Sequence, residues 1–312
     1  MIHPPADLPL YAAVELGSDS FRLHVGQIED GVLHLSASMA EPVRLAATID
    51  EDGCLDAAAM RRALVCLAEF RRALDAWHPQ AVRVVATAAL RMARNAPLFL
   101  PAAEQALGRP IDLISGKEAG RLVYMGVANT LGEAQGGRRL VVDIGSGSTG
   151  LVLGSGATPE RIDTFAVGAV RQSLSFFCDG VIDAVGFEAA VRSGRNRFAG
   201  SGMAGRGWSA SYGACGTVRA LAEIAQQTGI STGPLTPACL AELRRRFIDA
   251  GHVARVRLAW EAAARAPHLP GGLALLVGLM EELGIDELAP VHAGLRVGAL
   301  WDLHQCAVAC AE

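Results

Sequence analysis

The sequence has no excess of positive charge and no long apolar run. Its 312 residues include 32 acidic and 28 basic ones, a net charge of −4, whereas sequence-independent binders of DNA or RNA usually carry a basic excess. No stretch approaches the roughly 18 uninterrupted apolar residues of a membrane span, and residues 1–10 do not resemble a signal peptide. We therefore expect a cytoplasmic protein with no nucleic-acid partner and no membrane partner.

Cysteine and lysine are also scarce. The seven cysteines are odd in number, scattered, and include no C-x-x-C pair, which fits a reducing compartment better than a disulfide framework. Cys306 and Cys310 are four residues apart in a predicted helix, where we expect them to be small buried apolar residues. Lys117 is the only lysine. Nearly all positive charge is therefore arginine, which suits bidentate contacts to phosphate.

The remaining composition is that of a folded protein of two domains. Apolar residues make up 51% of the chain and charged residues 19%, which is ample for a buried core, and the length suggests two domains of ordinary size. Residues 132–137 form a short linker of small, polar and glycine residues. We expect a first domain over residues 1–131 and a second over 132–312, with a last helix (298–311) that can pack back on the first.

The most informative feature is an internal repeat. The segment VELGSDS (14–20) returns as VDIGSGS (142–148), 128 positions later. Each copy follows an apolar run and precedes an alternating strand pattern and then a third strand. Further strands and helices are predicted over residues 56–76 (helix), 81–86 (strand), 111–114 (strand), 115–127 (helix), 187–197 (helix), 217–227 (helix), 237–250 (helix) and 273–283 (helix). Strands that alternate with helices in both halves predict α/β layers.

The two repeated turns are rich in residues that suit a phosphate chain. Glycine and serine let backbone N–H groups approach phosphate oxygens closely, and hydroxyls add further donors. The candidate phosphate-binding residues are Gly17, Ser18, Asp19 and Ser20 in the first turn and Gly145, Ser146, Gly147, Ser148 and Thr149 in the second. Glu15 and Asp143 end the preceding strands and could hold Mg²⁺ against the same phosphates. Either turn alone could be a simple hairpin; the pair together favours phosphate binding.

Two further positions add weaker signals. Arg91 follows the predicted strand 81–86 closely and could grip a phosphate, although a solvated helix arginine would look the same. Gly216 and Thr217 open the predicted helix 217–227 after a third glycine-containing turn, and the N-terminus of a helix attracts anions.

These blocks together resemble the exopolyphosphatase/guanosine pentaphosphate phosphohydrolase (Ppx/GppA) family, in its short two-domain form. The blocks that carry the resemblance are AAVELGSDSFRLHVG, VATAALRMARNA, PIDLISGKEAGRLVYMGVA, LVVDIGSGSTGLVLG, GACGTVRAL and PGGLALLVGLMEELGIDEL…GLRVGALWDL. The resemblance implies the actin-like (ASKHA) fold, with two duplicated ribonuclease-H-like domains and a site in the cleft between them. It also implies inorganic polyphosphate or guanosine pentaphosphate as substrate, Mg²⁺ as cofactor, and a possible homodimer.

The departures from the family pattern fall at positions to which the resemblance assigns catalytic or metal-binding roles. Glu15 and Asp19 stand where the family usually has Asp and Asn. Ala119 occupies the position of the family's catalytic base, and Gly150 that of the last Glu of the second turn; Ser146 replaces a glycine. Glu118 is the nearest replacement base. It lies about 100° around the helix from position 119, and it could equally be a capping-box partner of Ser115.

The sequence thus predicts a Mg²⁺-dependent phosphoanhydride hydrolase of exopolyphosphatase type, with Glu15, Asp143 and Glu118 as candidate catalytic residues and Asp143 and Glu15 as metal ligands. The alternative is a protein that binds polyphosphate or the alarmone without hydrolysing it, because the phosphate-binding groups match the family better than the carboxylates do. A kinase would need a nucleotide-base pocket in the second half, and the sequence identifies none.

Overall fold

The computed structural model describes residues 8–132, 137–256 and 266–310. The chain forms two compact units: residues 1–134 together with 293–312, and residues 135–292. Residues 133–136 of the predicted linker lie outside the described part of the chain. The final helix, α11 (Leu295–Ala309), belongs to the first unit, so this unit is assembled from both ends of the sequence.

The first unit is built on a five-stranded sheet of order β3-β2-β1-β4-β5. β1 is antiparallel to β2 and parallel to β4, β2 is antiparallel to β3, and β4 is parallel to β5. The strands are β1 (Tyr11–Leu16), β2 (Phe21–Glu29), β3 (Val32–Glu41), β4 (Ala81–Ala86) and β5 (Asp112–Leu113).

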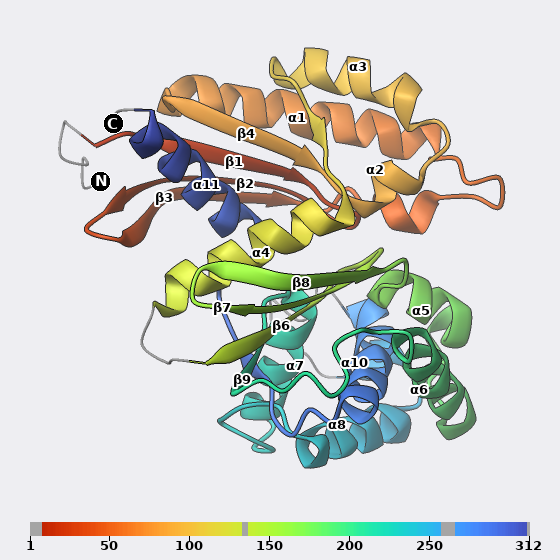
Figure 1. Cartoon of the computed structure of the whole chain (residues 1–312). Coiled ribbons are helices and arrows are strands. Elements are labelled where there is room, and N and C mark those ends of the chain that lie inside the picture. The colour runs from red at the N-terminus through yellow and green to blue at the C-terminus, as the bar shows by residue number, and fades with distance from the viewer. Residues whose placement is uncertain (1–7, 133–136, 257–265, 311–312) are drawn as a thin grey trace. The chain divides into compact units, whose positions relative to one another are not determined.

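Helices cover both faces of this sheet (Figure 1). They are η1 (Leu45–Thr48), α1 (Ala57–Trp77), α2 (Ala88–Met92), α3 (Ala96–Leu107) and α4 (Gly116–Leu131), with α11. Side chains of a strand alternate between faces. Val14 and Leu16 therefore pack in the core with α1 and α3, while Tyr11 and Ala13 pack with Leu300 of α11. Burial on both faces explains why β1 is apolar almost throughout.

α4 and α11 cross at very short range. A side chain on Gly298 would overlap the carbonyl oxygen of Leu122, and one on Gly126 would lie 2.5 Å from the carbonyl oxygen of Gly294. Glycine at both positions lets the two helix backbones touch. α11 is thereby held against α4 and β1, the elements that carry the chemistry of this unit.

The second unit repeats the same sheet. Its order is β10-β9-β6-β7-β8, so β6, β7, β8, β9 and β10 correspond to β1 to β5 and have the same parallel and antiparallel partners. A register irregularity falls in corresponding strand pairs, at Val25/Gly26 and at Leu153/Gly154. The strands are β6 (Arg138–Ile144), β7 (Thr149–Ser155), β8 (Thr158–Phe165), β9 (Ala210–Gly213) and β10 (Ala289–Pro290). The predicted α/β, actin-like duplication is confirmed.

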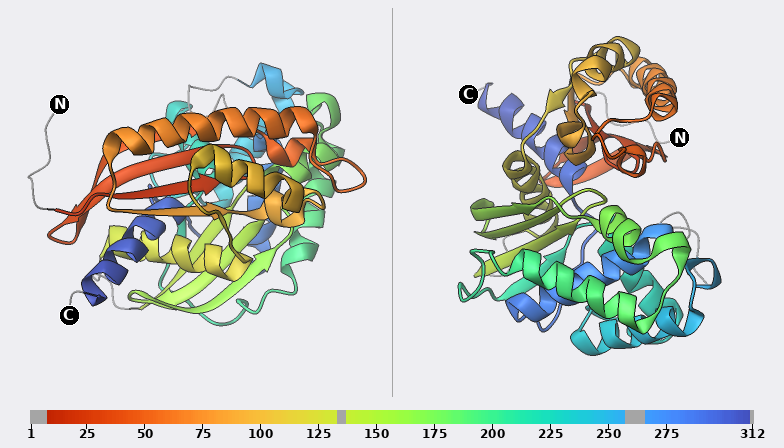
Figure 2. Two further views of the ribbon diagram at one scale, coloured as in Figure 1. Left: turned by 90° about the horizontal axis from the view of Figure 1, so that it is seen from above. Right: turned by 90° about the vertical axis from the view of Figure 1, so that its right-hand side faces the viewer.

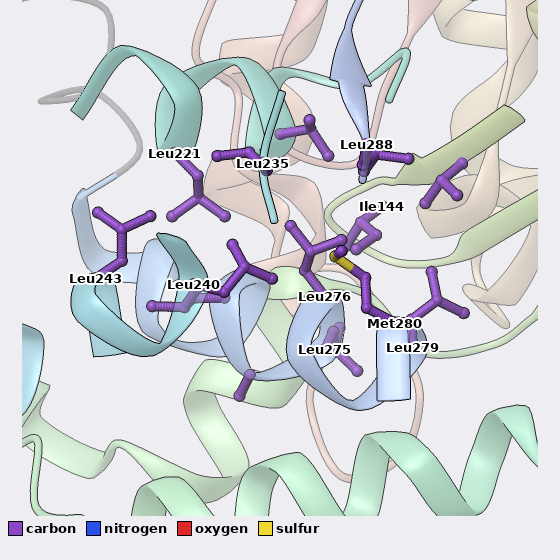
Figure 3. Close-up of a cluster of buried hydrophobic side chains, with 14 of the residues drawn as sticks. Ile144, Leu221, Leu235, Leu240, Leu243, Leu275, Leu276, Leu279, Met280 and Leu288 are labelled. Carbon is purple, nitrogen blue, oxygen red and sulfur yellow. The ribbon is translucent and has the colours of Figure 1, made fainter. Parts of the chain in front are cut away.

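The helices of the second unit gather on one face of its sheet (Figures 1 and 2). They are α5 (Ala169–Phe176), η2 (Cys178–Gly180), α6 (Ala184–Phe198), α7 (Gly216–Gln227), α8 (Pro237–Ala250), η3 (Val253–Arg255), η4 (Ala266–His268) and α10 (Leu269–Leu283). Leucines of α7, α8 and α10 converge with Ile144 of β6 and Leu288 in one buried cluster (Figure 3). This core fixes the N-terminus of α7 beside the end of β6.

One result corrects an expectation from the sequence. The prediction that Cys306 and Cys310 are buried is wrong, because both are exposed; the α4-facing residues of α11 lie in its first half. Among the described helices, none is long and apolar enough to cross a membrane.

Candidate phosphate-binding site

The first repeated turn, residues 17–20, connects β1 to β2. Two of its carbonyl oxygens are used by the segment that follows β3: the N–H of Ala46 donates to Ser18 O (2.8 Å) and the N–H of Arg44 to Asp19 O (2.6 Å). These bonds fix the peptide planes of the turn.

The second turn, residues 145–148, connects β6 to β7 and is fixed in a similar way. The N–H groups of Ala169 and Val170, at the start of α5, donate to Gly145 O (2.9 Å) and Ser146 O (3.1 Å). The N–H of Gly145 closes the turn on Ser148 O at 2.9 Å. The repeat therefore extends from sequence to hydrogen bonding.

The N–H groups of the turns are used very differently from the carbonyls. Within the described part of the chain, the backbone N–H groups of residues 17–20 and 146–148 donate to no protein acceptor. A side chain at Gly17 would lie 2.6 Å from Ser20 O, and one at Gly145 would lie 3.0 Å from Ser148 O. Glycine thus permits a tight turn whose donors remain for an anion, which is the arrangement of an anion-binding nest.

The carboxylate before the first turn is already paired. Glu15 Oε2 accepts a hydrogen bond from the guanidinium of Arg296 on α11, and Arg296 Nε lies 3.2 Å from His24 Nε2. Glu15 Oε1 is 3.5 Å from the position that a Cβ of Gly17 would take. The carboxylate therefore lies against the first turn with its charge offset by an arginine that is 281 positions away.

The carboxylate before the second turn has a more open neighbourhood. Asp143 stands opposite Gly150 across the β6–β7 pair. A Cβ built on Gly150 would meet only the Asp143 Cβ, at 4.0 Å. There is thus room beside Asp143, on the strand face shared with position 150.

Arg91 lies next to the first turn. The Ser18 hydroxyl accepts from the N–H of Ala89 at 3.0 Å, which ties the turn to α2. Arg91 is exposed, and its Nη1 donates to the carbonyl oxygen of Ile114 at 2.9 Å. Within the described residues no carboxylate pairs with it. A neutral carbonyl orients this guanidinium and leaves its charge uncompensated, as a phosphate-binding arginine requires.

The third glycine turn precedes α7. Cys215 is its N-cap, and the Cys215 sulfur accepts from the N–H of Val218 at 3.4 Å. Burial, with a smaller contribution from Asp143, raises the pKa of the Cys215 thiol to about 11. Cys215 is therefore a neutral cap at physiological pH, and the helix N-terminus at Gly216 keeps its attraction for an anion.

The two predicted threonine ligands have structural partners. The buried Thr149 hydroxyl donates to Val167 O (2.8 Å), and the buried Thr217 hydroxyl donates to Ile144 O (2.9 Å). These bonds hold the second and third turns against β6. Phosphate contacts from Thr149 and Thr217 stay a prediction, and their backbone N–H groups suit it better than their hydroxyls.

Glu118 belongs to an ion-pair network of which the local sequence shows one part, the i,i+3 pairing with Arg121. Its carboxylate accepts from Arg121 (Nε and Nη2, both 2.8 Å) and from Arg83 Nη2 (2.8 Å). Asp302 of α11 pairs with the same two arginines. Hydrogen bonding to Arg121 lowers the pKa of Glu118, and Arg83 lowers it further. A carboxylate held in this way is a poor proton acceptor.

At the N-terminus of α4, one of the two hydrogen bonds of the expected capping box is present. The Ser115 hydroxyl accepts from the N–H of Glu118 at 3.1 Å, while the Glu118 carboxylate turns to the arginines. Ala119 packs against an apolar cluster of Val85, Ile114 and Leu122. Position 119 is therefore part of the packed interior edge of α4.

The residues present fit magnesium only in a limited way. Among the described residues there is no group of three or more His, Cys, Asp or Glu side chains that could hold a metal. Mg²⁺ is commonly held by one or two carboxylates, with waters and substrate phosphates completing the octahedron. Asp143, with the open space beside Gly150, is one carboxylate that fits this role.

Comparison with known proteins agrees with this geometry. The model of the Ppx/GppA phosphatase family matches residues 24–306. The chain belongs to this family.

Relatives and solved structures extend the family assignment. A guanosine-5'-triphosphate,3'-diphosphate pyrophosphatase of Vibrio vulnificus is 37% identical over 297 residues, covering 95% of this chain and 59% of the relative. The chain thus spans about three fifths of that Ppx/GppA protein. The crystal structure of the Aquifex aeolicus family member has a TM-score of 0.80 (24% identity, 96% and 99% of the two chains). An exopolyphosphatase of Cytophaga hutchinsonii has a TM-score of 0.83 (19% identity, 94% and 97%). These two structures show the shared fold.

Proposed function

We propose that the chain is a phosphoanhydride hydrolase that removes a terminal phosphate from guanosine pentaphosphate or from inorganic polyphosphate. The observation that carries the proposal is the pair of glycine turns in which the N–H groups of residues 17–20 and 146–148 have no protein acceptor within the described residues. Such donors suit the closely spaced oxygens of a phosphate chain. Family membership supports the same reaction class, and the pyrophosphatase from Vibrio supports the guanosine substrate.

The roles of the residues follow from their surroundings. The N–H groups of the two turns bind phosphate oxygens, and Arg91 adds a charged contact. Asp143 would hold Mg²⁺, which when bound would offset charge on the phosphates. Because position 119 holds alanine and position 150 glycine, we propose that hydrolysis is slower, by roughly 10²–10⁴-fold, than with a positioned base.

A second function is favoured by one specific observation. The carboxylate nearest to the base position, Glu118, is held by two arginines that lower its pKa. A protein with intact phosphate donors and no available base would bind its ligand and release it unchanged. The alternative is therefore a non-catalytic binder of polyphosphate or of the guanosine alarmone.

The test is phosphate release by the purified chain with Mg²⁺ and either guanosine pentaphosphate or long-chain polyphosphate, with Asp143→Ala as control. Release that is abolished in Asp143→Ala supports the hydrolase. No release, together with measurable binding of either compound, would replace it with the non-catalytic binder. Absence of both release and binding would exclude both functions.

A further inference from the structure

The second unit has a pocket between α8 and α10 to which none of the glycine turns contributes. Its volume is about 560 Å³, and its lining residues fall within 237–286, so the pocket is complete within one unit. Leu240 and Met280, which Figure 3 shows on these two helices, belong to its walls. Ligand pockets commonly measure about 300–1,000 Å³ and often lie between helices. The pocket therefore has room for a whole small molecule.

The walls of this pocket are mostly apolar. Its lining residues recur every three or four positions over 237–248 of α8 and 277–284 of α10, which places each set on one face of its helix. The large apolar side chains among the lining residues are Leu240, Ile248, Val277, Met280 and Ile285. Such walls favour a ligand with an apolar body, because contact removes apolar surface of both partners from water.

The two arginines of the pocket already have partners. Arg244 Nη2 donates to Glu188 Oε2 at 2.9 Å. Arg245 donates to Glu242 Oε1 and to Asp249 Oδ2, at 2.7 Å each. The positive charge at the pocket is therefore offset within the protein, and it offers little attraction to an anionic ligand.

The two carboxylates of the pocket are in the opposite situation. Glu281 and Asp286 are exposed, and within the described part of the chain neither side chain has a hydrogen bond or an ion pair. They flank the end of α10 at Leu283, and the C-terminus of a helix carries a partial negative charge. The charge that remains uncompensated at the pocket is therefore negative, which favours a ligand with a cationic group.

α10 separates this pocket from the third glycine turn. A Cβ on Gly272, in the first turn of α10, would lie 2.4 Å from Cγ2 of Thr217. Gly284, which lines the pocket, lies about 18 Å further along the helix. A ligand between α8 and α10 is thus well removed from the anion-attracting N-terminus of α7.

We propose that the pocket between α8 and α10 binds a small amine with an apolar body. The apolar body lies against Leu240, Val277 and Met280, and the ammonium group lies at Glu281 and Asp286. The proposal assigns a second ligand site to the chain and does not rest on the proposed function.

The experiment measures binding of three probes to the intact chain by calorimetry at neutral pH. Octylamine, 1-octanol and octanoate share one aliphatic chain length and carry a positive charge, no charge and a negative charge. We expect octylamine to bind about tenfold more tightly than octanoate, with 1-octanol between them, which is the effect of two exposed ion pairs. Equal affinities, or tighter binding of octanoate, would overturn the proposal, as would the absence of binding by all three.

Two variants locate the site. Combining Glu281→Gln with Asp286→Asn should abolish the preference for octylamine and leave the affinity for 1-octanol unchanged. The matched control is Glu287→Gln, an exposed carboxylate that does not line the pocket. A double variant that behaves like Glu287→Gln overturns the assignment of the ammonium site.

The apolar part of the site is tested by filling it. Ala241 lines the pocket and is exposed on α8, so Ala241→Phe should fold and should weaken binding of all three probes by about fivefold or more. Ala238→Phe is the matched control, since Ala238 is exposed on the same helix outside the pocket. Thermal denaturation checks that both variants are folded, and equal affinities in the two would place the probes elsewhere and overturn the proposal.

Discussion

The two repeated turns share a backbone and differ in what surrounds their carboxylates. In the first unit, Glu15 is paired with Arg296 and faces Arg22 across the β1–β2 pair. In the second, Asp143 faces Gly150. Positions 22 and 150 are equivalent under the 128-residue repeat, so one copy has a cation where the other has no side chain.

This difference indicates a division of roles after duplication. Arginine beside a carboxylate neutralises it and fixes its position. The first turn is therefore suited to binding phosphate beside a carboxylate whose negative charge is already offset. A carboxylate beside open space can accept a metal ion or a second carboxylate. We infer that the first turn mainly binds phosphate and that the second holds the cation, and the substitutions below test this division.

The largest effect is expected at Asp143. Asp143→Asn should lower phosphate release by about a hundredfold or more, the size of losing one strong electrostatic contact in a transition state. Glu15→Gln should lower it by less than about tenfold, because Arg296 already offsets the charge of Glu15. Initial rates at saturating Mg²⁺ measure both. Equal losses in the two variants would contradict the division.

The second prediction places carboxylates at positions 119 and 150, where the resemblance implies that the family has them. Ala119→Glu combined with Gly150→Glu should raise hydrolysis by about 10²-fold, since a positioned base contributes at least that much. There is room for a side chain at position 150, whereas Ala119 packs against Val85, Ile114 and Leu122. The Gly150→Glu variant should therefore fold more readily than the Ala119→Glu variant.

The double variant is compared with both single variants and with the unchanged chain, after thermal denaturation has confirmed that each is folded. An unchanged rate in a folded double variant would mean that the site activates water through other groups.

The third prediction concerns Arg91. Arg91→Ala should weaken binding of inorganic tripolyphosphate by about tenfold, because hydrogen bonds to charged groups contribute about 1.5–3 kcal/mol. Calorimetry of the two proteins measures the effect. Arg94→Ala is the matched control, since Arg94 is exposed nearby and donates to the carbonyl oxygen of Asp52. Equal affinities in the Arg91 and Arg94 variants would remove Arg91 from the phosphate site.

Much of the fold could be predicted from local patterns. The strand at residues 81–86 and the helix at 237–250 have the bounds that their periodicity predicts. Local patterns do not predict α3, because Pro101 lies inside the helix. β9 was missed because it has only four residues, including Ser and Gly. Its strand state depends on parallel pairing with β6 and β10, which lie far away in sequence.

The limit of local sequence patterns is clearer in the candidate site than in the fold. The turns could be predicted because their glycines and serines are local signals for tight backbone geometry. The pairing of Glu15 with Arg296 joins the two ends of the chain, and that of Glu118 with Arg83 depends on packing between β4 and α4. Ion pairs between distant residues leave no periodic signal, so the sequence shows only Arg121, three residues away on the same helix, as a partner of Glu118.

The last and smallest effect tests whether Glu118 stabilises the first unit. Glu118→Gln should lower the free energy of unfolding by about 1 kcal/mol at neutral pH, the size of a partly exposed ion pair. The pKa of Glu118 is lowered from 4.5 in the folded chain. Its contribution is therefore present above pH 4.5 and is lost as the pH falls through the folded pKa. Urea denaturation should show the difference between the two proteins shrinking below pH 4.5.

The matched control is Glu51→Gln, an exposed carboxylate of the same unit. It should leave both the unfolding free energy and its pH dependence nearly unchanged. A catalytic Glu118 would instead give a variant that unfolds like the original chain and loses phosphate release. Stability lost with the rate retained would show that Glu118, like Glu15, is a carboxylate whose arginine partner serves the structure. It would remove Glu118 from the candidate catalytic residues.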